Sequence, residues 1–211
     1  MNASRPNTPA AFFPPNKPLL IVLSGPSGAG KDTILSQLKK SGYPIEFITT
    51  LTTRPRRARE KDKVSYHFVS VETFKQMIAG NELLEWASVY GNWYGVPREP
   101  IKRGLESGRD ALVKVDVQGA ATIKKILPQA VLICVVPSSL AELSARLRER
   151  HSESPFDLAL RLKTADDEMK QLPLFDYVIV NEQGKLDQAV SAVVAIITAE
   201  KHRAFPREVS L

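Results

Sequence analysis

One nine-residue segment limits the possible folds of this chain more than any other. The segment Gly25-Pro-Ser-Gly-Ala-Gly-Lys-Asp-Thr33 directly follows the apolar run 19–23 and precedes a stretch with helical spacing of apolar residues. In a strand, G-x-x-x-x-G-K loop and helix of this order, backbone N–H groups surround phosphate oxygens and the lysine reaches the outer phosphates. A glycine-rich surface turn would not need the lysine. The segment therefore predicts an α/β fold that binds a nucleoside triphosphate.

The residue after the lysine departs from this motif. A serine or threonine normally stands there and contacts Mg²⁺ through its hydroxyl, but this chain has Asp32, followed by Thr33. A carboxylate repels phosphates unless a cation lies between them. We therefore expect Mg²⁺ to accompany the nucleotide, with Asp32 or Thr33 as its protein contact, directly or through water. The predicted triphosphate site consists of Gly25, Pro26, Ser27, Gly28, Ala29, Gly30, Lys31, Asp32 and Thr33.

Composition narrows the class of protein without identifying a partner. No apolar run approaches the roughly 18 residues of a membrane helix. The single cysteine, Cys134, lies in an apolar run, which excludes an intrachain disulfide and fits a core thiol in a reducing cytosol. The net charge of +6 would suit a nucleic-acid binder, but basic residues cluster between 54 and 63, where they could equally hold a small anion. These features predict a soluble, cytoplasmic protein and leave its ligand open.

Short apolar segments alternate with segments of helical periodicity along most of the chain. We expect strands at 19–23, 47–50, 111–117, 131–136 and 177–180, and helices near 31–41, 119–127, 139–150, 155–171 and 186–204. This alternation is typical of a parallel sheet covered by helices on both faces. Between 50 and 97 the pattern changes to short aromatic-rich strands around one helix at 71–79, which predicts an insert. Residues 1–17, rich in proline, are expected to form a flexible tail.

The insert contains residue types suited to a second anion. Arg54 and Arg57 offer forked donors for a phosphate, and Tyr66 and Tyr94 can add hydroxyl donors to the same oxygens. A solvated basic face with structural tyrosines is the alternative for any one of these residues. Glu85 follows two leucines and precedes Trp86, so its carboxylate is expected to be partly buried and to need donors. Guanine supplies two such donors, its N1–H and its 2-amino group.

These motifs, in this order, resemble the guanylate kinases, which transfer the γ-phosphoryl group of ATP to GMP. The resemblance runs from about residue 19 to residue 203 and includes Tyr66-His-Phe68, Gly91-Asn-Trp-Tyr-Gly95 and Asp116-Val-Gln-Gly119. It implies a P-loop NTPase core with a five-stranded parallel sheet flanked by helices (18–49 and 98–211), a small mixed α+β GMP-binding insert (50–97) and a helical lid (about 146–162). The GMP ligands that it implies are Thr50, Arg54, Arg57, Tyr66, Glu85, Tyr94 and Asp116.

The resemblance also assigns roles outside the insert. Arginines of the lid would close on the transferring phosphates, and Asn181 would lie near the adenine of ATP. The implied catalytic residues are Lys31, Arg54, Arg150 and Arg161. ATP with Mg²⁺ and GMP, with dGMP as a further acceptor, would be the partners, and neither nucleic acid nor a membrane is expected. A non-catalytic interaction module of the same fold, or a kinase for another nucleotide or sugar phosphate, is the alternative.

Two further positions differ from the family pattern. Val96 stands where a serine or threonine usually donates to the GMP phosphate, and Lys114 replaces the first aspartate of an Asp-x-Asp motif. Lys114 and Asp32 are departures of opposite sign on two sides of the expected metal site. We therefore predict that they form an ion pair, or that Asp32 contributes to the metal's outer shell through water.

Overall fold

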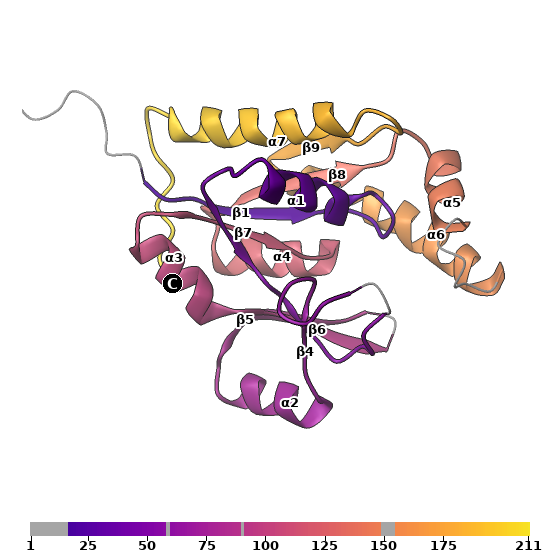
Figure 1. Cartoon of the computed structure of the whole chain (residues 1–211), viewed down its shortest axis with the longest axis horizontal. Coiled ribbons are helices and arrows are strands. Elements are labelled where there is room, and N and C mark those ends of the chain that lie inside the picture. The colour runs from indigo at the N-terminus through magenta and orange to yellow at the C-terminus, as the bar shows by residue number, and fades with distance from the viewer. Residues whose placement is uncertain (1–16, 58–59, 90, 149–154) are drawn as a thin grey trace, which may run out of the picture.

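The computed structural model describes residues 17–57, 60–89, 91–148 and 155–211. Its core is a five-stranded parallel sheet in the order β2-β7-β1-β8-β9 (Figure 1). The strands are β1 (Leu20–Ser24), β2 (Ile45–Ile48), β7 (Asp110–Lys114), β8 (Val131–Val136) and β9 (Tyr177–Val180). The predicted α/β core with a five-stranded parallel sheet is therefore confirmed. Because all strands run the same way, their carboxyl ends, and the loops that follow, lie along one edge of the sheet.

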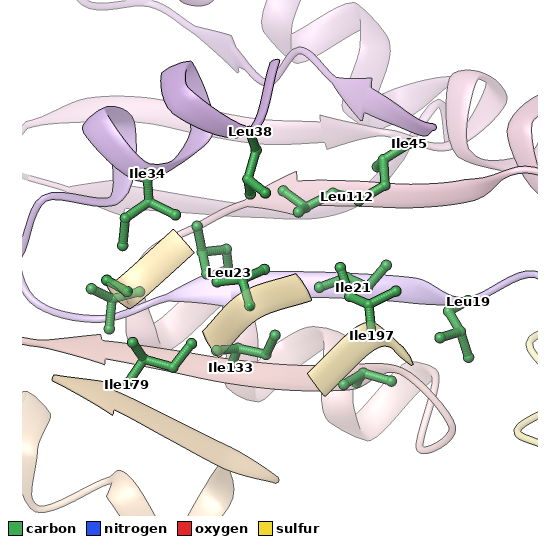
Figure 2. Close-up of a cluster of buried hydrophobic side chains, with 14 of the residues drawn as sticks. Leu19, Ile21, Leu23, Ile34, Leu38, Ile45, Leu112, Ile133, Ile179 and Ile197 are labelled. Atoms are coloured by element: carbon green, nitrogen blue, oxygen red, sulfur yellow. The ribbon is translucent and has the colours of Figure 1, made fainter. Parts of the chain in front are cut away.

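Helices cover both faces of this sheet, which explains why β1 is buried along its whole length and apolar up to Leu23. On one face, Ile21 and Leu23 pack with Ile34 of α1 (Lys31–Lys40) and Ile197 of α7 (Leu186–Lys201), as Figure 2 shows. On the other face, Val22 joins a cluster with side chains of α3 (Arg98–Glu106) and α4 (Val117–Ile126). Alternate side chains of one strand thus anchor two layers of helix and fix the start of the loop that follows.

The chain forms a second sheet from the segment that lies between β2 and β7 in the sequence. Its order is β4-β3-β6-β5, from β3 (Leu51–Thr52), β4 (His67–Phe68), β5 (Leu83–Val89) and β6 (Asn92–Pro97). Helix α2 (Val71–Ala79) places the buried Phe74 against Leu51 and Leu83. The segment therefore has a small core of its own. The division into a core and an insert that binds a separate substrate stays a prediction.

Two helices follow β8 and lie at one end of the molecule (Figure 1). They are α5 (Leu140–Arg148) and α6 (Pro155–Met169), which pack through Leu143, Leu147 and Ala165. The one-turn helix η1 (Leu172–Leu174) then leads back to β9. Part of the predicted lid, residues 149–154, lies outside the described residues, as does most of the predicted tail.

One local prediction was wrong, and one helix was missed. The strand expected at 111–117 ends at Lys114, because Asp116 begins α4 instead: its carboxylate accepts a hydrogen bond from the Gly119 amide at 2.8 Å. Helix α3 was not predicted, since it contains Pro100 and Gly104. Pro100 lies in the first turn, where its missing N–H is not needed, and Gly104 packs closely on Glu46 of β2.

Candidate active site

A cleft of about 520 Å³ lies between the phosphate-loop motif, the second sheet and α6. It brings together residues that are far apart in the sequence. Of the predicted site residues it is lined by Gly25, Ser27, Gly28, Gly30, Lys31, Asp32, Thr50, Arg54, Arg57, Tyr66, Glu85, Tyr94, Asp116 and Arg161. Pro26, Ala29, Thr33 and Asn181 do not line it, and Arg150 lies outside the described residues. One cavity thus joins most of the two predicted anion sites.

The phosphate-loop motif turns sharply between β1 and α1. Gly25 has φ 130°, and a Cβ there would lie 2.0 Å from the carbonyl oxygen of Val135. Gly30 has φ 95° and is the residue before the first turn of α1. These backbone conformations favour glycine, and they aim the amino end of α1, the positive end of the helix dipole, at the cleft. The loop has the backbone of a phosphate cradle.

Lys31 lies within this loop. Its Nζ donates to the carbonyl oxygens of Gly25 and Pro26, the latter at 3.0 Å. Burial lowers the pKa of Lys31, whereas the carboxylates of Glu168 and Asp32 oppose that shift. The loop's own carbonyls therefore hold the cation in place, and the carboxylates of Glu168 and Asp32 favour its charged form.

Glu168 was not among the predicted site residues. It lies on α6 and lines the cleft, and burial raises the pKa of its carboxyl to about 7. The sequence held a signal for it: Arg161, Thr164 and Glu168 follow helical spacing on one face, and all three line the cleft. Arg161 donates to the Ser27 hydroxyl at 3.2 Å, so α6 reaches the phosphate-loop motif directly.

The predicted ion pair between Asp32 and Lys114 is confirmed. Lys114 Nζ lies 2.5 Å from Asp32 Oδ1 and 2.8 Å from the hydroxyl oxygen of Tyr66. Asp32 belongs to α1, Lys114 ends β7, and Tyr66 comes from the segment before β4. Lys114 therefore links the phosphate-loop helix to the segment that leads into the second sheet.

Glu60, a carboxylate that sequence reasoning missed, contacts the side chain of Arg54 and the backbone of Arg57. Arg54 Nη2 lies 2.7 Å from Glu60 Oε1, and the backbone N–H of Arg57 donates to Glu60 Oε2 at 2.9 Å. Arg54 also hydrogen bonds with Tyr94, and its guanidinium carbon lies 5.6 Å from the centre of the Tyr66 ring. Glu60 follows Arg57 by three residues, a spacing that could have indicated the contact. The four predicted phosphate ligands of the insert are thus gathered around one side of the cleft.

A buried carboxylate faces the remaining part of the cleft. Glu85 is 5% exposed, and its Oε2 has no hydrogen-bond partner among the described residues. Burial, and then the nearby charge of Asp116, raise the pKa of Glu85 to about 8. Thr50 is also buried and lines the same cleft. A buried acceptor without a donor is costly, so this arrangement is suited to a ligand that brings N–H groups.

Asn181 contacts the phosphate-loop motif but does not line the cleft. Its side-chain N–H donates to the backbone carbonyl oxygen of Ala29 at 2.8 Å. The side chain of Arg146 donates to the backbone carbonyl oxygen of Asn181 at 2.6 Å. Asn181 also lies against Gly30, where a Cβ would be 2.1 Å from its nitrogen. Arg146 was not a predicted site residue. Contact between Asn181 and a nucleotide base stays a prediction.

The family model described as "Guanylate kinase" matches residues 17–200. The chain belongs to the guanylate kinase family. The guanylate kinase of Symbiobacterium thermophilum is 44% identical to this chain over 191 residues, which cover 90% of this chain and 90% of the relative. Guanylate kinase 2, chloroplastic/mitochondrial, of Oryza sativa subsp. japonica is 41% identical over 199 residues, covering 94% of this chain and 70% of the relative.

A solved structure of the same family has the same architecture. The guanylate kinase of Anaplasma phagocytophilum aligns with a TM-score of 0.72 at 29% identity, covering 90% of this chain and 89% of that chain. The family resemblance predicted from the motifs is therefore confirmed. Within the described part of this guanylate kinase family member, no helix is long and apolar enough to cross a membrane.

Proposed function

We propose that this chain transfers the γ-phosphoryl group of ATP to a phosphate oxygen of GMP, and also of dGMP, giving ADP and GDP or dGDP. The observation that carries this proposal is the shared cleft: the loop around Lys31 and the unpaired carboxylate of Glu85 line the same cavity. A triphosphate on the loop and a guanine at Glu85 would therefore place their phosphates in the space between.

The donor half of the reaction would use the loop and α6. Backbone N–H groups at the start of α1 and the ammonium of Lys31 would bind the β- and γ-phosphates of ATP. Arg161 already contacts Ser27 of the loop, which supports a role in which its guanidinium would stabilise the charge that develops on the transferred group. Arg150 would act with it from the lid. The bond from the γ-phosphorus to the bridging oxygen breaks as a bond to the acceptor oxygen forms.

The acceptor half would use the insert. Arg54, Arg57, Tyr66 and Tyr94 would bind the phosphate of GMP, which is already anionic and needs no general base. Glu85, with Asp116 and Thr50, would bind guanine, whose N1–H and 2-amino group are donors. Adenine presents an acceptor at N1, which would face the Glu85 carboxylate unfavourably. Val96 is fully buried in the core, so the hydroxyl that it replaces is lost from this half.

Mg²⁺ fits the oxygen donors at the start of α1. The described residues contain no group of three or more His, Cys, Asp or Glu side chains that could hold a metal alone. A metal there would share its ligands with nucleotide phosphates, as Mg²⁺ commonly does, with Asp32 or Thr33 contributing directly or through water. When bound, Mg²⁺ would neutralise charge on the β- and γ-phosphates.

Domain closure would complete the site. We propose that 18–49 and 98–211 form the core and that 50–97 form the GMP-binding insert. The lid near 146–162 would close over both nucleotides and exclude water, which otherwise would hydrolyse ATP. A cytosolic location fits the single buried thiol of Cys134, and cell fractionation would test it.

Production of ADP from ATP tests the proposed reaction. The purified chain is assayed with GMP, dGMP, AMP, CMP and UMP, and GMP and dGMP should support turnover far above the others. Lys31→Met should abolish turnover while GMP binding is retained, and Lys40→Met, on the exposed end of the same helix, is the matched control. Faster turnover with another acceptor would indicate a different kinase. Binding of GMP without any turnover would indicate an interaction module.

A further inference from the structure

One lysine lies between the two phosphate-binding regions of the cleft. Lys114 ends β7, and its Nζ contacts Asp32 of α1 and the Tyr66 hydroxyl on the insert side. Tyr66 is the shared element, because Lys114 Nζ lies 4.1 Å from the centre of its ring and Arg54 approaches the same ring at 5.6 Å. Two cations from different parts of the fold therefore flank one tyrosine of the proposed acceptor site.

The hydrogen bond to Tyr66 has a fixed direction. A lysine ammonium has three donors and no acceptor, so the Tyr66 oxygen must accept from Lys114 at 2.8 Å. The phenolic proton is then directed toward another acceptor. An oxygen that accepts this proton in ordinary geometry would lie about 4.5 Å from Lys114 Nζ. The other oxygens of a phosphate bound in this way would come within direct reach of the ammonium.

Lys114 and Asp32 differ in how easily each can leave the pair. The Lys114 side chain is 10% exposed, whereas that of Asp32 is 69% exposed. Water can replace the lysine as a partner of Asp32, but a buried ammonium without an anion is costly. When a phosphate arrives, the carboxylate can move away while the lysine stays.

We propose that Lys114 binds the phosphate of the acceptor nucleotide directly, as a third cation beside Arg54 and Arg57, and that Asp32 is the anion that this phosphate displaces. This inference rests on the proposed function, since it names a further residue of the same acceptor site. It also explains together why Asp32 and Lys114 differ from the family pattern with opposite charges. The carboxylate keeps the buried lysine paired until the phosphate binds.

The proposal predicts opposite effects for the two members of the pair. In the full chain without ATP and with EDTA present, Lys114→Met should weaken GMP binding at least about tenfold, the loss expected for a hydrogen bond between charged groups. Asp32→Asn should tighten GMP binding severalfold, because the phosphate no longer competes with a carboxylate. The double variant should bind GMP like Lys114→Met alone. Calorimetric titration measures all four proteins.

Two controls separate phosphate binding from general damage. Guanosine has no phosphate, so its affinity should be the same in all four proteins. Lys39→Met removes the same charge from the same region, but Lys39 lies over Phe47 outside the main cleft, and GMP binding should be unchanged. Because Asp32 is largely exposed, Asp32→Asn tests the proposal even if Lys114→Met does not fold.

Several outcomes would overturn the proposal. Weaker GMP binding in both single variants, or an equal loss for guanosine, would mean that the pair only supports the fold. Normal GMP binding by Lys114→Met would mean that the lysine does not contact the phosphate. If wild-type protein binds and phosphorylates GMP, these results leave the proposed function intact. If wild-type protein does neither, the proposed function itself fails.

Discussion

GMP binding is predicted to release a proton from Glu85. Burial raises the pKa of this carboxyl to about 8 in the ligand-free chain, so at pH 7 only roughly one molecule in ten carries the charge. Guanine offers two donors, and a carboxylate that accepts both is favoured over the acid. Bound GMP should therefore hold Glu85 ionised. The affinity for GMP should be proportional to the fraction of ligand-free protein in which Glu85 is ionised.

The size of the effect follows from that pKa. At pH 7 each GMP bound should release about 0.9 proton, and at pH 8 about 0.5, because half of the free protein is then already ionised. The dissociation constant should fall about fivefold between pH 7 and pH 8. The GMP phosphate contributes little in this range, since the second ionisation of a phosphate monoester lies near pH 6 and is largely complete.

Calorimetry in two buffers of different ionisation enthalpy measures the number of protons directly. Glu85→Gln is the control: it keeps the shape of the side chain but cannot ionise, and it should bind GMP weakly with no proton release at either pH. Proton release near zero for the wild type at pH 7, or unchanged release in Glu85→Gln, would refute the assignment of Glu85 as the guanine ligand.

Three further predictions concern stability and the phosphate-loop motif. The pKa of Glu85 is higher in the folded chain than in the unfolded chain, so the wild type loses stability as pH rises toward about 8 and the carboxyl ionises. Glu85→Gln cannot ionise and does not lose this stability. In ligand-free chemical denaturation, the free energy of unfolding of Glu85→Gln relative to wild type should therefore rise by about 3 kcal/mol between pH 5 and pH 8. Arg207→Ala should lower the free energy of unfolding by about 2 kcal/mol, because Glu200 is buried and Arg207 donates to both of its oxygens; an unchanged urea midpoint would contradict this. Asn181→Ala leaves the Ala29 carbonyl with fewer donors, so the KM for ATP should rise severalfold while that for GMP is unchanged; an equal rise in both would place Asn181 elsewhere in the mechanism.

Local sequence signals were sufficient where the chain's own backbone dictates the structure. The loop at Gly25 and Gly30 needs left-handed backbone angles, and the apolar run of β1 needs two covered faces, so both could be predicted. The ion pair of Asp32 and Lys114 was also predictable, since opposite charges had replaced two residues expected to lie close together. These predictions depend on short segments whose relative positions follow from the order of a parallel sheet.

Contacts that depend on tertiary packing were harder to predict. Helix α3 contains a proline and a glycine that look unfavourable until its first turn and its contact with β2 are known. Glu168 looks like an ordinary charged residue of a helix face, and only the docking of α6 on the cleft brings it near Lys31. Glu60 and Arg146 likewise act on other site residues, a role that charge and spacing alone do not distinguish from a solvated surface.

The carboxylates explain how this cleft tolerates its own positive charge without ligands. Arg54 is paired with Glu60, Lys114 with Asp32, and Lys31 faces Glu168. Nucleotide phosphates would therefore exchange partners with these carboxylates rather than neutralise bare cations, which reduces the net gain from each new ion pair. Selectivity should then depend more on the proposed guanine contact at Glu85, whose Oε2 has no hydrogen-bond partner among the described residues. On this reasoning a phosphate without a base should bind weakly to the proposed acceptor site, and most of the binding free energy of the acceptor nucleotide should come from its base.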